Sequence, residues 1–178
     1  LDASLDLITA EGLEGFSMRE VARRAGVSHQ APYHHFPDRE AIMAAIVAEG
    51  FQGLRDRSLA ALDGINDPHA RFTAIGRAYV DFALSHPAHF KLMFRSEHVR
   101  EDRHDEARAC AQGAYDVLES VARDVAAATG HGEREVALTA WSMVHGLSTL
   151  MLEGKLDKAA SSQAARNAAA QGVLAFFE

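Results

Sequence analysis

The spacing of apolar residues is the feature that most constrains the fold of this chain. Apolar side chains recur every three or four positions along nearly all of its 178 residues, which is the period of an amphipathic α-helix. Strand-like alternation of apolar and polar residues between turn pairs is essentially absent. We therefore predict an all-α protein with about nine helices.

Glycine and serine divide the first part of this pattern into short helices. Gly12 is expected to end a first helix, because glycine favours the position just after a helix C-terminus. Ser17 and Glu20 have the spacing of a capping box at the start of a second helix. Gly26 stops that helix, and a third is predicted over residues 29–36.

Pro32 stands inside the predicted third helix. With Ser28 as the N-cap, the N–H that proline lacks would have bonded only the carbonyl of Ser28 itself. The cost should therefore be below the roughly 3 kcal/mol of a proline in mid-helix, and we retain the helix. Val27 is expected to fill the junction between the second and third helices.

Beyond residue 39 the same periodicity predicts a larger helical body. The charged stretch 95–106 offers little to bury, so we expect a surface loop or a mobile helix start there. The body helices are predicted over residues 39–62, 68–85, 105–129, 133–153 and 161–177, with a short helix that holds Phe90, Met93 and Phe94.

Three segments of the N-terminal part form one distinctive pattern: SMREVARRAGVS at 17–28, APYHHF at 31–36, and the pair Arg39 and Glu40. This pattern closely resembles the DNA-binding domain of the TetR family of transcriptional regulators. It implies a helix-turn-helix whose protruding third helix enters the major groove of DNA. Residues 1–46 are then a DNA-binding domain, and residues 47–178 a ligand-binding and dimerisation domain.

The resemblance also implies roles for single side chains. Contacts to phosphates position such a protein on the duplex, whereas contacts to base edges specify the sequence. The predicted DNA-binding set consists of Ser17 and Ser28 at the helix starts, Tyr33, His35 and Arg39 for phosphates, and Arg19, His29, Gln30 and His34 for base edges.

The acidic charge of the chain must be reconciled with DNA binding. The net charge is −7, and residues 1–50 hold four arginines against eight acidic side chains. Because affinity for phosphates comes mainly from lysine and arginine, this charge argues against a nonspecific polyanion binder. The alternative is that the helix-turn-helix is only a packing motif. We expect a local cationic cluster formed by Arg19, Arg23, Arg24, His29, His34, His35 and Arg39.

The body resembles a subgroup of TetR regulators that carries the signature Trp-x-x-x-His-Gly, here Trp141, His145 and Gly146. Trp141 and His145 are four residues apart, so they share one helical face and can touch. Gly146 is expected to let another helix approach closely. The pair is either a core aromatic beside a hydrogen-bonded histidine or part of a ligand site.

The family resemblance further implies an unknown small-molecule effector. By default such a regulator is a repressor, and the effector would move the helix predicted over 39–62 and separate the two DNA-binding domains beyond the roughly 34 Å spacing of half-sites. Apolar residues at helical spacing can equally be plain core. The candidate wall residues are Phe72, Ile75, Tyr79, Phe82, Met93, Phe94, Tyr115, Trp141 and His145.

The resemblance implies a homodimer formed by the last two helices of each subunit as a four-helix bundle. The sequence permits it, because a stripe of small residues ending in aromatics would match solvent poorly on a monomer. A disordered tail is the alternative interpretation. The stripe consists of Ala165, Ala169, Gly172, Val173, Phe176 and Phe177.

No cofactor, metal or membrane partner is predicted. Common catalytic and phosphate-binding motifs are absent, and His86 and His89 have no evident third metal ligand. No apolar run reaches the ~20 residues of a membrane-spanning helix. The single Cys110 cannot form an intramolecular disulfide, which fits a reducing cytoplasm. The competing classes are an all-α small-molecule carrier or enzyme and an interaction scaffold, neither of which would bind DNA.

Overall fold

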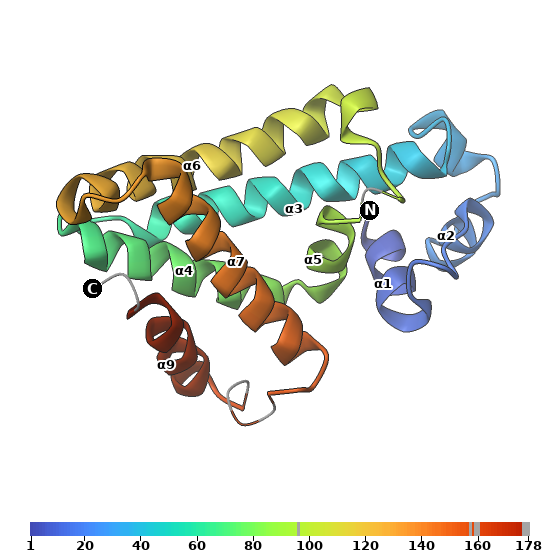
Figure 1. Cartoon of the computed structure of the whole chain (residues 1–178). Coiled ribbons are helices and arrows are strands. Elements are labelled where there is room, and N and C mark those ends of the chain that lie inside the picture. Colours follow the sequence, from blue (N-terminus) through green and yellow to red (C-terminus); the bar gives the residue numbers. More distant parts are fainter. Residues whose placement is uncertain (96, 157, 159–160, 176–178) are drawn as a thin grey trace. The chain divides into compact units, whose positions relative to one another are not determined.

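A computed structural model of the chain describes residues 1–95, 97–156, 158 and 161–175. The described residues form eight α-helices and two 3₁₀ helices and contain no strand (Figure 1). The predicted all-α class is confirmed, whereas the count of about nine helices is not. None of the described helices is long and apolar enough to cross a bilayer.

The helices form two compact units, which are described separately. The first unit contains Leu1–Phe51 and His86–Ala111, and the second contains Gln52–Ser85 and Gln112–Glu178. Two long helices therefore contribute one segment to each unit. The predicted functional division after residue 46 stays a prediction.

The first unit opens with α1 (Asp2–Glu11) and α2 (Met18–Arg24). As predicted, α1 ends at Gly12, whose φ of 77° is a left-handed conformation that glycine adopts without strain. Ser17 caps α2, because its Oγ accepts a hydrogen bond from the N–H of Glu20 at 3.2 Å. The Glu20 carboxylate, which was expected to complete a capping box, binds arginine side chains instead.

A Schellman motif ends α2. Gly26 takes a φ of 68°, its N–H donates to the carbonyl of Arg23, and the N–H of Val27 donates to the carbonyl of Ala22. The predicted stop at Gly26 is thus confirmed. Val27 does not fill a junction as expected, since its side chain is 47% exposed and no full helix follows to cover it.

The predicted third helix is wrong in length and type. In place of an α-helix over 29–36 there is a single 3₁₀ turn, η1 (Ala31–His34). Its hydrogen bonds reach three residues back, as from the N–H of Tyr33 to the carbonyl of Gln30. Pro32 has no N–H with which to continue an α-helical ladder. The free-energy cost of placing Pro32 in an α-helix over 29–36 was therefore underestimated.

The segments on either side of this turn also differ from expectation. Ser28 was predicted to be an N-cap, but it contributes its backbone carbonyl, which accepts from the N–H of Ala31. Downstream, Asp38 caps the long helix α3 (Arg39–Ala61), because its Oδ1 accepts from the N–H of Ala41 at 2.8 Å. The predicted long helix from residue 39 is confirmed.

Helix α5 (Pro87–Met93) packs on the part of α3 that belongs to the first unit. The approach is close at Gly50, where a Cβ would lie 2.6 Å from the Sδ of Met93. Phe94, which follows α5, sets its ring edge-on to that of Phe51 at a centroid distance of 5.6 Å. A side chain at position 50 would therefore force the Met93 side chain to move.

The charged stretch 95–106 contains a second 3₁₀ turn, η2 (Glu101–Arg103). The backbone N–H of Arg100 donates to Oε1 of Glu40 at 3.0 Å. The Nε2 of His104 lies 3.4 Å from the same carboxylate oxygen. These polar contacts connect the stretch to the first turn of α3, so it is attached to the first unit at more than its two ends.

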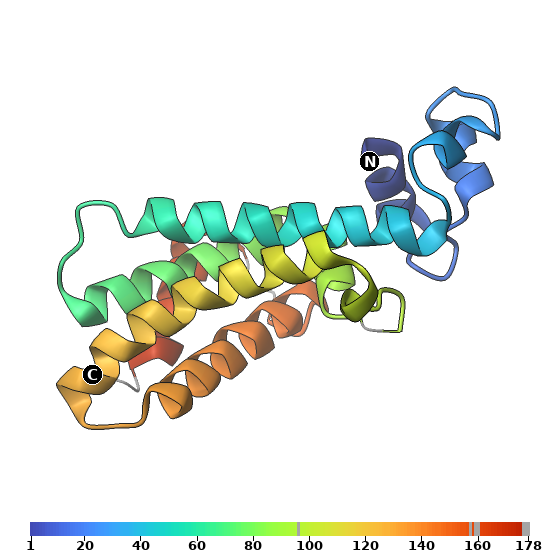
Figure 2. The same ribbon diagram turned by 90° about the horizontal axis from the view of Figure 1, so that it is seen from above.

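The second unit is a bundle built on the end of α3 and four further helices. The end of α3 and α6 run side by side (Figure 2). The boundaries agree with the predictions within a few residues, except that the last helix is shorter. The four helices are α4 (Pro68–Ser85), α6 (Asp105–Thr129), α7 (Glu133–Leu152) and α9 (Gln163–Leu174).

The core of this unit lies where α4, α7 and α9 pack on one another (Figure 1). At Gly76 a Cβ would collide with the side chain of Leu174, so α9 packs closely on α4 there. At Gly146 a Cβ would meet no described atom of this chain within 4 Å, so the described residues include no helix that packs closely there. The close approach of a helix at Gly146 stays a prediction, and the close approach seen within the chain is on α4.

We expect Ser17→Ala to destabilise the first unit by about 1 kcal/mol, because an N-terminal N–H of α2 loses its acceptor. Urea-induced unfolding followed by circular dichroism measures the change. Ser142→Ala, at an exposed position within α7, is the matched control and should be close to neutral. Equal stabilities of the two variants would contradict a capping role.

Candidate functional site

Every side chain of the predicted DNA-binding set is exposed. Two of the nine lie at the start of α2, and the others lie between residue 28 and the first residue of α3. Tyr33 is 50% exposed, so its ring is accessible to a ligand. The exposed set comprises Ser17, Arg19, Ser28, His29, Gln30, Tyr33, His34, His35 and Arg39.

Acidic side chains neutralise two arginines of the expected cationic cluster. Arg23 donates to both carboxylate oxygens of Glu20, at 2.9 and 2.6 Å, and the Nε of Arg24 donates to the same group at 3.1 Å. Arg24 also binds the carboxylate of Glu11. The hydrogen bonds from Arg23 and then Arg24 lower the pKa of Glu20 to about 2. Among the described residues, Arg19 has no such acidic partner.

Arg39 has a structural role that sequence reasoning missed. Its Nη2 donates to the carbonyl of Leu13 at 2.8 Å, and its Cζ lies 5.8 Å from the ring centroid of the buried Phe16. The first residue of α3 thus holds the turn between α1 and α2. In the sequence, the one hint of this role was Phe16, an aromatic residue directly before the Ser17 cap that an arginine side chain could pack on.

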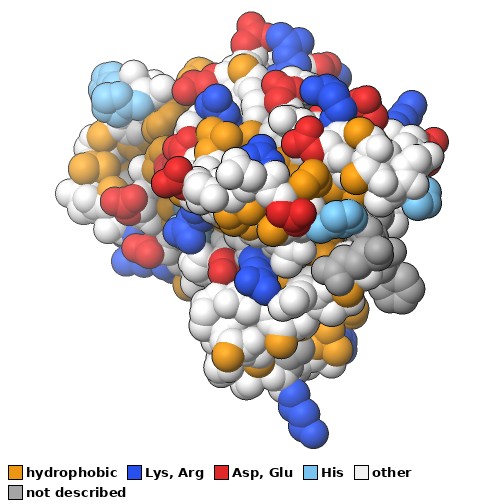
Figure 3. Space-filling view, turned by 90° about the vertical axis from the view of Figure 1, so that its left-hand side faces the viewer, with side chains coloured by type: hydrophobic (Ala, Val, Ile, Leu, Met, Phe, Trp, Pro, Cys, Tyr) orange, Lys and Arg blue, Asp and Glu red, His pale blue; other side chains and the backbone are white. Residues whose placement is uncertain are grey.

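The cations available to a ligand are therefore fewer than the sequence suggests. With two arginines engaged by acids and Arg39 engaged by a carbonyl, the positive side chain that remains on α2 is Arg19. Figure 3 shows another face of the molecule, not the one that carries α2, and on it acidic and basic side chains are interspersed. Any attraction to phosphates must come from a small local group rather than from a basic surface.

A second group of polar side chains connects α4 and α7 in the second unit. The hydroxyl of Tyr79 lies 2.8 Å from Nδ1 of His145 and shares a hydrogen bond with it. The Nε1 of Trp141 donates to the same hydroxyl at 3.3 Å. The ring of Tyr115, on α6, lies 6.0 Å from that of Trp141. Four of the predicted wall residues therefore lie together.

Burial controls the protonation of this group. It raises the pKa of the Tyr79 hydroxyl, although the hydrogen bond from Trp141 acts in the opposite direction. It lowers the pKa of His145, so the neutral imidazole is favoured. A neutral ring with its proton on Nε2 has a free lone pair on Nδ1, which would accept a hydrogen bond from the Tyr79 hydroxyl.

The other predicted wall residues are placed differently. Phe72 and Phe82 are each 2% exposed, within the packed interior of the second unit. Phe94 belongs to the first unit. The described residues contain no group of three or more histidine, cysteine or acidic side chains that could hold a metal ion. Ligand contact by the predicted wall residues stays a prediction.

Comparison with known sequences identifies the class and then the family. The sequence model of bacterial regulatory proteins of the tetR family matches residues 1–46. The model described as the tetracyclin repressor-like C-terminal domain matches residues 72–174. These two matches make the chain a member of the class of bacterial regulatory proteins. The chain belongs to the TetR family.

Curated relatives match over part of their length. The regulator BetI of Rhizobium meliloti is 34% identical over 77 residues, which is 43% of this chain and 38% of that protein. The transcriptional activator FasR of Mycolicibacterium smegmatis is 25% identical over 123 residues, or 66% of this chain and 56% of that protein. The chain thus spans about two fifths to just over half the length of these relatives.

Solved structures match over nearly the whole chain. A protein of unknown function from Rhodococcus sp. RHA1 is 29% identical with a TM-score of 0.81, covering 99% of this chain and 90% of that one. FadR of Bacillus subtilis, solved in complex with stearoyl-CoA, is 13% identical with a TM-score of 0.78, covering 99% and 94%. At that identity the second likeness shows the fold alone.

We expect Tyr79→Phe to destabilise the second unit by about 1–3 kcal/mol, because Trp141 and His145 both lose a hydrogen-bond partner in a partly buried place. Chemical unfolding monitored by fluorescence measures the change. Tyr115→Phe removes a hydroxyl from the neighbouring ring and should cost much less. A Tyr79 variant as stable as the Tyr115 variant would mean that the bridge adds nothing to stability.

Proposed function

We propose that the chain is a DNA-binding transcriptional regulator, a repressor that a small-molecule effector releases from its operator in the cytoplasm. The observation that carries the proposal is that a chain of the TetR family exposes all nine side chains of the predicted DNA-binding set. A carrier or enzyme has no need to present such a set to solvent. The named relatives, which are transcriptional regulators, support the same class.

In this proposal the segment from Ser28 to His35 is the part that reads DNA. It is short and irregular, and η1 supplies its only regular turn. Gln30 could bond adenine through two hydrogen bonds, and Arg19 could bond guanine in the same manner. Arg39 would act chiefly by holding the turn below the segment, since its guanidinium is already engaged.

The decisive comparison is between two arginines of one helix. We expect Arg19→Ala to weaken binding to a palindromic operator near the chain's own gene about tenfold or more, since a good base contact is worth about 1–3 kcal/mol. Arg23→Ala is the matched control, because its guanidinium is held by Glu20 and its loss should change affinity far less. Fluorescence anisotropy across a range of salt concentrations measures both.

Two results would contradict this assignment. Equal losses in the Arg19 and Arg23 variants would mean that only overall charge matters. Failure of the unmodified protein to bind any palindromic sequence from that region, at every salt concentration, would favour the carrier or enzyme class.

We further propose that the effector acts through the second unit and that the chain belongs to the subgroup with the Trp-x-x-x-His-Gly signature. The hydrogen bonds of Tyr79 to Trp141 and His145 support a role for the first two signature residues. The stearoyl-CoA complex of FadR, a protein of the same fold, supports a ligand-responsive body. Because α3 runs through both units, a ligand that shifts its end would be felt at its start.

We propose a homodimer formed by α7 and α9. Leu138 and Leu150 on α7 are 41% and 44% exposed, which leaves large apolar side chains on that helix in water. The predicted stripe needs correction, because Ala165, Ala169 and Val173 are half-buried on the inner side of α9, and Phe176 and Phe177 lie outside the described residues. Gly172 of the stripe is exposed, and the other exposed small residues of α9 are Ala164 and Ala168.

We expect Leu150→Glu to raise the dimer dissociation constant at least tenfold, which is about 1.4 kcal/mol, because a charge would have to be buried in the interface. Sedimentation velocity over a range of protein concentrations measures it. Leu59→Glu places the same charge on α3 at a side chain of similar exposure, 45%, and should leave the dimer intact. A Leu150 variant that dimerises as well as the Leu59 variant would exclude this face.

A further inference from the structure

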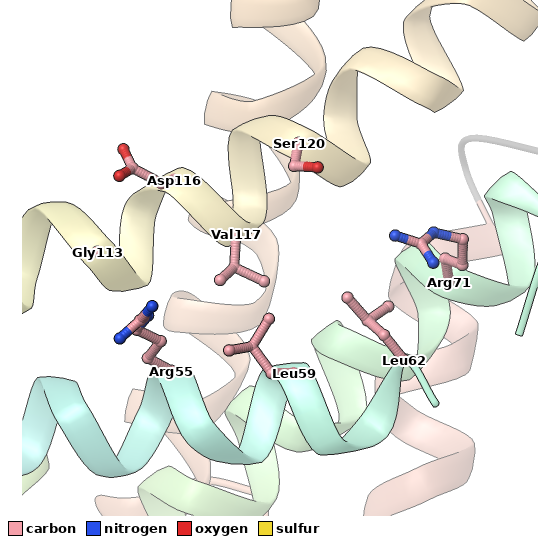
Figure 4. A pocket seen from close by; sticks show the side chains of 8 residues that line it. All are labelled: Arg55, Leu59, Leu62, Arg71, Gly113, Asp116, Val117 and Ser120. Atoms are coloured by element: carbon pink, nitrogen blue, oxygen red, sulfur yellow. The ribbon is translucent and has the colours of Figure 1, made fainter. Parts of the chain in front are cut away.

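A groove in the second unit lies between the end of α3, the start of α4 and the middle of α6 (Figure 4). On both α3 and α6 the lining residues follow helical spacing, so each helix presents one face to the groove. The volume is about 250 Å³. The lining residues are Arg55, Leu59, Leu62, Arg71, Gly113, Asp116, Val117 and Ser120, and none of them belongs to the predicted effector wall.

Arg55 is a half-buried cation that no acid neutralises. Its guanidinium has no ion pair or hydrogen bond with any described residue. The side chain lies along α6 at Gly113, where a Cβ would be 3.4 Å from Cδ and 3.6 Å from Nε of Arg55. A partly desolvated guanidinium is costly unless an anion binds it, and a carboxylate matches its paired N–H groups.

Arg71 closes the opposite end of the groove (Figure 4). Its Nη1 donates to the carbonyl of Ile65 at 3.2 Å, and its Nε lies 3.7 Å from the carboxylate of Asp124. That Nε is buried and makes no hydrogen bond. Since Asp124 already balances much of its charge, Arg71 attracts an anion less strongly than Arg55 does.

The surface between the two arginines is apolar. Leu59 and Val117 face one another across the groove, and Leu62 lies beyond them towards Arg71 (Figure 4). Leu59 is 45% exposed, so an apolar ligand would cover a side chain that water now contacts. The volume is below the roughly 300–1,000 Å³ of drug-sized sites, which limits the ligand to a few carbon atoms beyond its head group.

The acidic residue of the groove limits the charge of the ligand. Asp116 lies on α6 close to Gly113, and the amide of Gln112 donates to its Oδ1 at 2.7 Å. Asp116 is one helical turn from Gly113, against which Arg55 packs, so its charge would repel a phosphate or another multiply charged group on Arg55 more than a singly charged one. The lining thus favours an anion with one negative charge.

We propose that this groove binds a small organic acid, with its carboxylate on Arg55 and its aliphatic chain on Leu59, Val117 and Leu62. The suggestion that a small organic acid is the effector of the regulator rests on the proposed function, in which the second unit binds an effector. Binding at the groove can nevertheless be measured on the protein alone, without DNA.

The test is isothermal titration calorimetry of the full chain with three probes of equal chain length, hexanoate, 1-hexanol and 6-aminohexanoate. We expect hexanoate to bind and 1-hexanol to bind at least tenfold more weakly, because the alcohol has no charge for Arg55. The ammonium of 6-aminohexanoate would enter the apolar part of the groove, so this probe should also bind weakly.

Variants distinguish the groove from other places on the chain. Arg55→Gln should weaken hexanoate about tenfold or more, whereas Arg134→Gln, at an exposed position on α7, should leave it within twofold. Ser120→Trp, at an exposed position, should block the groove without changing charge. Equal binding of the three probes, no binding of hexanoate, or hexanoate binding that survives both groove variants would overturn the proposal.

The two proposals fail separately. If hexanoate binds in the groove but the protein binds no operator, the regulator function fails and the groove assignment stands. If the protein binds its operator but hexanoate does not bind, only the groove assignment fails. Changed operator affinity in the presence of hexanoate, lost in Arg55→Gln, would support both.

Discussion

The second unit depends on the close packing of α4, which contacts both α7 and α9. In the contact with α9, the end of the Leu174 side chain fills the space that a Cβ at Gly76 would take. Interiors of this kind are packed as densely as organic crystals, so one added methyl group at such a crossing must displace a neighbour. The outward faces of α7 and α9, on which the proposed dimer rests, are oriented by that contact.

Local charge pairing, rather than net charge, decides what the N-terminal residues can bind. Glu20 engages two arginines of α2 and leaves Arg19 without an acidic partner. A chain with a net charge of −7 can therefore present a selective cation to DNA while its acidic excess suppresses nonspecific association. The same logic applies in the second unit, where Asp124 balances Arg71 and leaves Arg55 to attract an anion.

Much of this was available from the sequence. Helical periodicity predicted the all-α class and most helix boundaries, because burying the apolar face of each helix is the main source of favourable free energy in folding. The starts and stops at Ser17 and Gly26 followed from local hydrogen-bonding and φ preferences. The resemblance to the TetR family came from a local window too, and the matches to residues 1–46 and 72–174 confirm it.

Contacts between residues distant in the chain could not be predicted from it. Nothing in the spacing of Gly76 and Gly146 says which one faces another helix of the same chain, and the sequence signature did not indicate Gly76. The engagement of Arg39 by Leu13, the bridge from Tyr79 to His145 and the groove at Arg55 each join segments that only folding brings together. The amino-acid sequence by itself determined the all-α class, most of the helices and the family, because periodicity and capping are local, although the third helix proved to be a single 3₁₀ turn. Tertiary structure alone decided which polar groups are satisfied, because that depends on neighbours across the fold.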